Sequence, residues 1–269
     1  ALHNSAQRVN PPRCHSKTRV EVLERLHNWI IMQLDWRKHW LLWLNGAAGA
    51  GKSAIMQTTA EDCVRAAIAI ASFIFMRTDN SRNHTKYLVG TLVYQLLQQV
   101  PETADEILLS IEDNPLVFAQ SLETQFMMLV VLPLLHISNP LHQPFVIIID
   151  ELDACLDQSH QADLIKVISN ISRWKDIPVI FLISSRREPQ ILAEFGMVMS
   201  ESTLEVVPLD DSDASEDIRN FLNDKFTIIR QARIHRKHLP NNWPSISIVN
   251  EIVDKSSGQF IFASTVVNY

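Results

Sequence analysis

"WLLWLNGAAGAGKSAIMQ", residues 40–57, contains three of the six glycines in this chain of 269 residues. An uninterrupted apolar run precedes the glycines, as is typical of a buried strand, and residues 53–67 follow with the pattern of a helix. Glycine tolerates positive φ angles and lets other groups approach the backbone closely. Its concentration between a strand and a helix therefore predicts a loop that offers bare backbone to a ligand.

Residues 46–53, GAAGAGKS, match the G-x4-G-K-[ST] pattern of a phosphate-binding P-loop. The expected phosphate contacts are the backbone N–H groups of Gly46, Ala47, Ala48, Gly49, Ala50 and Gly51. The helix that begins at Lys52 would turn its positive end toward the phosphates, the lysine would reach the β- and γ-phosphates, and the Ser53 hydroxyl would coordinate Mg²⁺. A ligand-free Gly/Ala turn is the alternative, and the position between strand and helix disfavours it.

The segment FVIIIDELDAC, residues 145–155, is the clearest strand in the chain and ends in three acids. We expect Asp150 to hold the same Mg²⁺, mainly through water. Hydrolysis also needs a carboxylate that orients the attacking water, and Glu151 and Asp153 both compete for that role. The alternative interpretation is a solvated acidic turn.

A third strand, PVIFLISSR, ends at Arg186. If this strand lies beside the strand of Asp150, the arginine is placed to sense a γ-phosphate through a charge-assisted bond. A surface arginine in the basic pair with Arg187 is the alternative.

Strands alternate with helices along the chain, which predicts right-handed crossovers and a parallel sheet covered on both faces. The expected fold is α/β: a P-loop three-layer sandwich with a mostly parallel five-stranded sheet, followed by a small helical subdomain. We expect an N-terminal linker over 1–16, the α/β domain over 17–208 and the helical subdomain over 209–269. The five expected strands are 39–45, 68–76, 143–150, 178–186 and 203–209.

Composition excludes several other classes. The net charge of −6 argues against nucleic acid as a partner, and the basic cluster at 230–238 is interpreted as a solvated helix end. Three cysteines without CxxC spacing fit reduced thiols in the cytoplasm. The longest apolar run, 127–136, is too short for a membrane span. The first residue, Ala1, and the apolar C-terminal end suggest a piece of a longer chain.

Eight segments in this order and spacing resemble the NACHT domain of STAND-class signalling P-loop NTPases, in the version found in fungal NLR-like receptors. They are CHSKTRVEVLERLHNWI, WLNGAAGAGKSAI, ASFIFMRTDNSRN, LVGTLVYQLLQQVP, FVIIIDELDAC, FLISSRREPQI, DIRNFLNDKF and SSGQFIFASTVV. The matching segments run nearly from end to end of the chain.

The resemblance implies an ATP/ADP switch that uses Mg²⁺, is closed with ADP, and associates with other copies of itself when ATP is bound. It implies effector and sensor-repeat domains in the same longer chain, and roles in innate immunity and heterokaryon incompatibility. It assigns phosphate and metal contacts to Gly46, Gly51, Lys52 and Ser53, the Mg²⁺ role to Asp150, and sensing to Arg186. It also places Thr18 and Arg19 near the base and ribose.

The chain departs from the family pattern at four positions. Lys17 replaces a common glycine, Arg187 a common proline, Glu151 a small residue, and Ala154 the final glutamate of the acidic motif, whereas Asp153 is retained. We therefore expect weak ATPase activity, with Asp153 as the retained acid. A scaffold that binds nucleotide without hydrolysing it is the alternative. A GTPase is disfavoured because the N-K-x-D motif is absent.

Overall fold

The computed structural model describes residues 11–33, 36–174, 177–199, 204–210, 213–231, 240 and 243–268. Its centre is a five-stranded sheet with the strand order β2-β3-β4-β1-β5, and all four strand pairings are parallel. This confirms the predicted α/β class. The strands are β1 (Leu41–Asn45), β2 (Ile70–Ile74), β3 (Phe145–Asp150), β4 (Val179–Ser185) and β5 (Leu204–Pro208).

The register brings the carboxyl ends of the strands to one edge of the sheet. Asn45 at the end of β1 pairs with Ser185 on one side and Pro208 on the other, and Asp150 at the end of β3 pairs with Ile74. Strand β4 lies between β1 and β3. The loops that follow β1, β3 and β4 therefore meet at this edge, where parallel α/β sheets bind their ligands.

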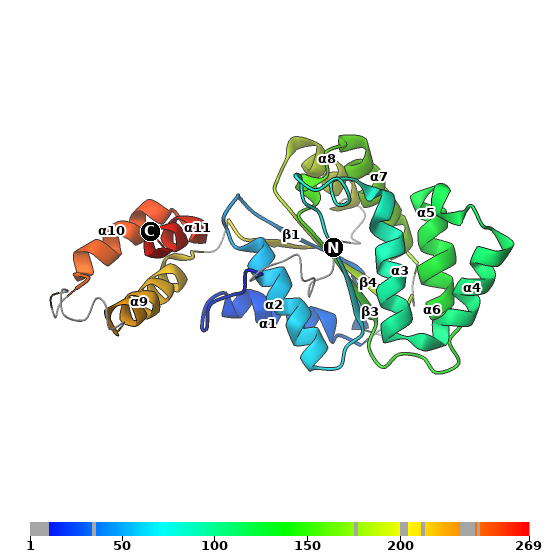
Figure 1. Cartoon of the computed structure of the whole chain (residues 1–269), viewed down its shortest axis with the longest axis horizontal. Coiled ribbons are helices and arrows are strands. Elements are labelled where there is room, and N and C mark those ends of the chain that lie inside the picture. The colour runs from blue at the N-terminus through cyan, green and yellow to red at the C-terminus, as the bar shows by residue number, and fades with distance from the viewer. Residues whose placement is uncertain are drawn as a thin grey trace.

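Helices cover the sheet on both sides (Figure 1). In this view α1 and α2 lie below the sheet, α7 and α8 lie above it, and α3 to α6 form a group at the right. The bounds are α1 (Val20–Ile30), α2 (Lys52–Arg65), α3 (Leu88–Gln99), α4 (Ala104–Asp113), α5 (Leu122–Phe126), α6 (Leu132–Leu135), α7 (Gln158–Ser172) and α8 (Pro189–Met199). Short 3₁₀ turns occupy Thr85–Tyr87, Pro101–Thr103, Val117–Ala119 and Leu152–Ala154.

The apolar run at 127–136 is largely helical, and the helix changes its geometry there. Met127–Val131 form a π-helical segment between α5 and α6, and Pro133 stands in the first turn of α6. Proline has no N–H to donate to the carbonyl four residues earlier, and such a gap is accommodated by a local widening of the helix. None of the helices in the described part of the chain combines the length and apolar character needed to cross a membrane.

The strands that carry the site are completely buried. Every residue of β1, β2, β3 and β4 is buried, as continuous apolar strands require when helices cover both faces. The outer edge of β2 is closed by a side chain of α3. The amide of Gln95 accepts a hydrogen bond from Ser72 N (2.9 Å) and donates one to Ser72 O (2.9 Å), as a neighbouring strand would.

Three helices follow the sheet: α9 (Ser215–Gln231), α10 (Ile246–Ser256) and α11 (Phe260–Asn268). They pack on one another around Ile218, Leu222, Val253 and Ala263, in a hydrophobic cluster separate from that of the sheet. This is the small helical subdomain expected from the sequence. The boundaries at 16 and 208 stay predictions. Residues 1–10 of the expected linker and 232–238 of the basic cluster lie outside the described residues.

Two local details differ from expectation. Thr18 followed by Glu21 at the third position predicts a capping box with Thr18 as the N-cap. The N-cap of α1 is instead Arg19 with φ 54°, and it forms no side-chain cap hydrogen bond. The Thr18 hydroxyl instead donates to His15 O (2.7 Å), so the capping interpretation is wrong. Helix α8 has no counterpart among the elements expected from the sequence. Its first residue is Pro189, and at this position the missing N–H of a proline costs nothing.

Candidate functional site

The loop 46–51 joins the end of β1 to the start of α2. Gly49 and Gly51 have φ angles of 78° and 95°, which a residue with a side chain adopts only with strain. Gly51 is the N-cap of α2, so the positive end of the helix faces the inside of the loop. The backbone N–H of Ala47 donates to Asp210 Oδ1 at 2.8 Å, which shows that the loop already binds a carboxylate oxygen.

Lys52 closes the loop from within. Its ammonium donates to Gly46 O (2.7 Å) and Ala47 O (2.9 Å), and the residue is buried. Burial lowers the pKa of Lys52, while the negative charge of Asp153 acts in the opposite direction. Within the described residues the ammonium of Lys52 donates to carbonyl oxygens of the loop itself, so an anionic oxygen in the loop would offer a stronger partner.

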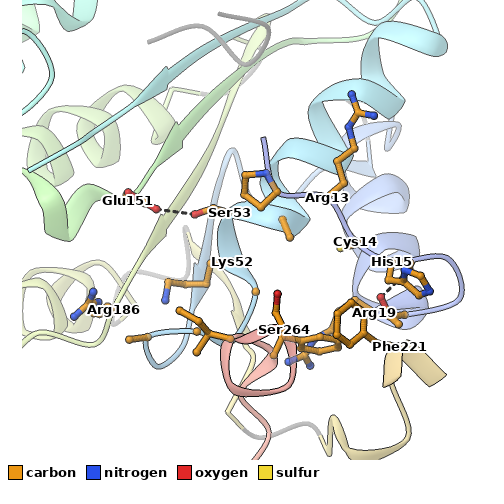
Figure 2. Close-up of a pocket in the computed structure, with 18 of the residues that line it drawn as sticks. Arg13, Cys14, His15, Arg19, Lys52, Ser53, Glu151, Arg186, Phe221 and Ser264 are labelled. Carbon is orange, nitrogen blue, oxygen red and sulfur yellow. Dashed lines mark hydrogen bonds between the residues drawn. The ribbon is translucent and has the colours of Figure 1, made fainter. Parts of the chain in front are cut away.

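Oxygen atoms of Ser53, Asp150 and Glu151 lie close together. The Oγ of Ser53 lies 3.0 Å from Glu151 Oε1 (Figure 2). It also lies 3.4 Å from Asp150 Oδ1. Asp150 is buried and also accepts a hydrogen bond from the Ser184 hydroxyl. Mg²⁺ is typically bound by one or two carboxylates together with water and phosphate oxygens. The residues present fit this ion, although no group of three His, Cys, Asp or Glu side chains suited to a metal occurs in the described residues.

Glu151 adopts the left-handed conformation, with φ 57° and ψ 45°. Its backbone N–H donates to Asp150 Oδ1 and to Ser184 Oγ, both at 3.1 Å. A residue other than glycine in this region costs about 1–3 kcal/mol, and such strain persists where the surroundings hold it. In this conformation the Glu151 side chain reaches the Ser53 hydroxyl.

Asp153 faces Arg186 instead. The Arg186 backbone N–H donates to Asp153 Oδ1 at 3.0 Å, and Arg186 Nε lies 3.1 Å from Oδ2. The backbone carbonyl of Asp153 accepts from Arg77 Nη2 at 3.1 Å. Both carboxylate oxygens of Asp153 are therefore engaged by the residue that follows β4.

A cavity of about 450 Å³ connects these groups (Figure 2). Of the residues expected from the sequence, its lining includes Thr18, Arg19, Ala48, Gly49, Gly51, Lys52, Ser53, Glu151, Asp153 and Arg186. Gly46, Ala47 and Ala50 belong to the same loop, and Asp150 lies directly behind Ser53, but these four do not line the cavity. The volume is typical of small-molecule sites, which measure about 300–1,000 Å³.

The other end of the cavity is formed by residues that sequence reasoning did not select: His15, Phe221, Phe260 and Ile261. His15 Nε2 lies 2.9 Å from Asp224 Oδ2, and its ring meets Phe221 edge-on. These contacts join His15 to residues of α9 that lie more than 200 residues later in the chain. No pattern in the sequence predicts a contact between residues so far apart. All three cysteines lie in the described residues and are free thiols, and Cys14 lines the cavity.

Arg19 links the loop to the C-terminal helices. It is buried and donates from Nη2 to Ala50 O at 3.0 Å, while its guanidinium stands 5.4 Å from the centre of the Phe260 ring. Its backbone N–H donates to Asp217 Oδ2 at 2.9 Å. Burial lowers the pKa of Arg19, and Asp217 counteracts this effect. Residues of the phosphate loop, the N-terminal segment and the helical subdomain thus share one cavity.

Comparison with solved structures identifies the fold. The Walker-type ATPase PABY2304 of Pyrococcus abyssi superimposes with a TM-score of 0.54 at 15% identity, over 96% of this chain and 74% of that one. Domain III of the replication initiation protein DnaA of Thermotoga maritima gives a TM-score of 0.44 at 12% identity, over 94% of this chain and 83% of that one. PCH-2 of C. elegans gives a TM-score of 0.42 at 16% identity, over 89% of this chain and 57% of that one. The first of these shows that the chain has a P-loop ATPase fold.

Among the curated proteins, none matches this chain. The family described as "Nephrocystin 3, N-terminal" matches residues 24–186, a range that includes the phosphate loop, the acidic strand and Arg186. This match extends over more than half of the sequence. The chain therefore belongs to the Nephrocystin 3, N-terminal family.

Proposed function

We propose that this chain is an ATP/ADP-binding switch domain with weak Mg²⁺-dependent ATP hydrolysis. One observation carries the proposal. The P-loop, Glu151 and Arg186 line the same cavity as residues of α9 and α11. A ligand in this cavity would contact both the α/β domain, proposed as 17–208, and the helical subdomain, proposed as 209–269.

The phosphates would bind the backbone N–H groups of the loop and the N-terminus of α2. Lys52 would transfer its hydrogen bonds from the carbonyls of Gly46 and Ala47 to phosphate oxygens, each charged bond contributing about 1.5–3 kcal/mol. Ser53 and Asp150 would hold Mg²⁺, which when bound neutralises charge on the β- and γ-phosphates. Thr18, Arg19 and the aromatic rings at the other end of the cavity would surround the base and ribose.

For hydrolysis, the geometry supports Glu151 over Asp153 as the acid that orients water. Glu151 Oε1 lies 3.0 Å from Ser53 Oγ, whereas both oxygens of Asp153 are engaged by Arg186. A carboxylate must be within hydrogen-bond reach of the water that it activates. The strained conformation of Glu151 and the Ala154 departure agree with slow turnover.

The resemblance to NACHT domains supports a place in a longer cytoplasmic signalling receptor, with effector and sensor-repeat domains, that associates with other copies of itself when ATP is bound. A shift from 1:99 to 99:1 between two states requires about 5.5 kcal/mol of differential binding. Several charge-assisted bonds to a γ-phosphate, of about 1.5–3 kcal/mol each, would supply that difference.

Steady-state phosphate release from pure protein with Mg²⁺ and ATP tests the proposal. We expect turnover above background that Glu151→Gln lowers by about 10²–10⁴-fold, the usual contribution of a general base, with ATP still bound. Asp153→Asn is the matched control and should keep most of the turnover. Nucleotide binding without turnover would favour the non-hydrolysing scaffold, and loss of turnover in Asp153→Asn alone would assign the base to Asp153.

A further inference from the structure

Asp153 and Arg186 form an unequal ion pair. The carboxylate side chain is 11% exposed and the arginine side chain is 53% exposed. Asp153 is fixed in the 3₁₀ turn after β3, and its carbonyl is held by Arg77. Arg186 begins the loop after β4, and its backbone N–H is anchored on Asp153 Oδ1. The guanidinium can therefore leave the carboxylate by side-chain rotation, while the backbone of both residues stays in place.

We propose that Asp153 sets the preference between ATP and ADP, because it competes with the γ-phosphate for the Arg186 guanidinium. The inference rests on the proposed function, since it requires a nucleotide in the cavity. Asp153 is in this account a positioning residue and not the general base.

The charges at the site give the competition its direction. Both partners line the cavity together with Lys52, and their charges act on the pKa of Lys52 in opposite directions, so the three groups are close. ADP brings no group to the position of the γ-phosphate, and Arg186 would stay on Asp153. ATP brings an anion that offers oxygens to the planar, forked guanidinium, for which phosphate is a favourable partner.

Because of this competition, the wild type should prefer ATP over ADP less strongly than a protein in which Arg186 has no carboxylate partner. Each ATP molecule must first free Arg186 from Asp153. Removal of the Asp153 charge removes this cost for ATP alone. Its effect through Lys52 acts on ADP and ATP alike and does not change the ratio of the two affinities. A partly exposed ion pair gives a modest effect, so the gain in ATP affinity should be about fivefold, or about 1 kcal/mol.

The experiment measures the affinities of ADP and of a non-hydrolysable ATP analogue, both with Mg²⁺, by competition with a fluorescent ADP. Asp153→Asn keeps an oxygen that can accept from the Arg186 N–H but has no charge. Glu251→Gln is the matched control, because it removes the carboxylate charge of another exposed ion pair, with Lys255, and neither of these residues lines the cavity. The same pair of variants is made in an Arg186→Ala background.

We expect Asp153→Asn to raise the ratio of analogue to ADP affinity about fivefold, and Glu251→Gln to leave it within twofold. In the Arg186→Ala background, Asp153→Asn should have no effect on the ratio. An unchanged ratio in Asp153→Asn, or the same increase without Arg186, overturns the inference while nucleotide binding itself persists. Absence of nucleotide binding by the wild type would instead defeat the proposed function.

A measurement on the wild type keeps the inference testable if Asp153→Asn does not fold. The NMR signal of the Arg186 Nε–H group, assigned by its loss in Arg186→Ala, reports the partner of the guanidinium. It should be the same in the free and ADP-bound protein and shifted with the ATP analogue. Equal shifts with both nucleotides, or no shift with the analogue, would contradict the competition.

Discussion

Gly49→Ala tests the contact between the phosphate loop and the helical subdomain. Gly49 is not one of the two glycines that the P-loop pattern requires. A Cβ atom at this position would stand 2.3 Å from Ile261 Cγ2 and 3.0 Å from Ile261 Cβ. Side-chain rotation can move Cγ2, but Ile261 Cβ is fixed to the backbone of α11. The variant therefore requires α11 to move away from the loop, with loss of the bond from Ile261 N to Gly49 O (3.4 Å).

Two contributions to the free energy destabilise the docked state of Gly49→Ala. The φ angle of 78° imposes about 1–2 kcal/mol on any residue with a Cβ atom. Overpacking against α11 adds about 1–3 kcal/mol. Gly51→Ala isolates the first cost, because Gly51 has φ 95° and nothing within 4 Å of its Cβ position. The overpacking cost is present only in Gly49→Ala. The population with α11 undocked should therefore be roughly fivefold to 150-fold larger in Gly49→Ala than in Gly51→Ala.

Hydrogen–deuterium exchange of the nucleotide-free protein measures this population directly. We expect the amides of residues 260–268 to exchange faster in Gly49→Ala, and to keep the wild-type rate in Gly51→Ala. Ile261→Ala removes the closest atom and should restore part of the protection in the Gly49→Ala protein. If α11 exchanges at the same rate in both glycine variants, Gly49 does not hold the docked helix and the reasoning is refuted.

Two further predictions concern stability. Gln95→Leu removes two buried hydrogen bonds to the backbone of β2 and should lower the free energy of unfolding in urea by about 2–5 kcal/mol, whereas Gln98→Leu on the exposed side of α3 should change it by less than about 0.5 kcal/mol. Hydrogen bonds from Ser81 lower the pKa of Asp79 from 3.8 to about 2. Asp79 should therefore add stability above pH 3.8 that is lost as the pH falls through about 2. In a plot of the urea midpoint against pH, Asp79→Asn should show a smaller decrease over this range than the wild type. Equal profiles of the two proteins would contradict this prediction.

The strands and the phosphate loop could be predicted because their signals are local. Five apolar runs gave the five strands, and the glycine pattern between a strand and a helix placed the loop. The far end of the cavity could not be predicted, since His15 and Phe221 meet only through the tertiary fold. The capping box at Thr18 failed because a tertiary bond to Asp217 holds the neighbouring Arg19 in a left-handed conformation.

The acidic motif shows what the backbone adds to a sequence pattern. Sequence alone left Glu151 and Asp153 as competing acids. The left-handed conformation of Glu151 is one that glycine adopts without strain, and in this conformation the glutamate side chain reaches Ser53. The partner of Asp153, in turn, comes from the adjacent strand β4, and only the strand order brings the two together.

Calorimetry with ATP and Mg²⁺, on the wild type and on Lys52→Ala, tests the central claim that this cavity binds a nucleoside triphosphate. Lys52 is buried, and its ammonium bonds within the loop. The loss of this ammonium should weaken ATP binding at least tenfold, the value of one charged hydrogen bond of about 1.5–3 kcal/mol. Lys86 is exposed and does not line the cavity, so Lys86→Ala should bind ATP as the wild type does. Equal affinity in Lys52→Ala and the wild type would contradict the account.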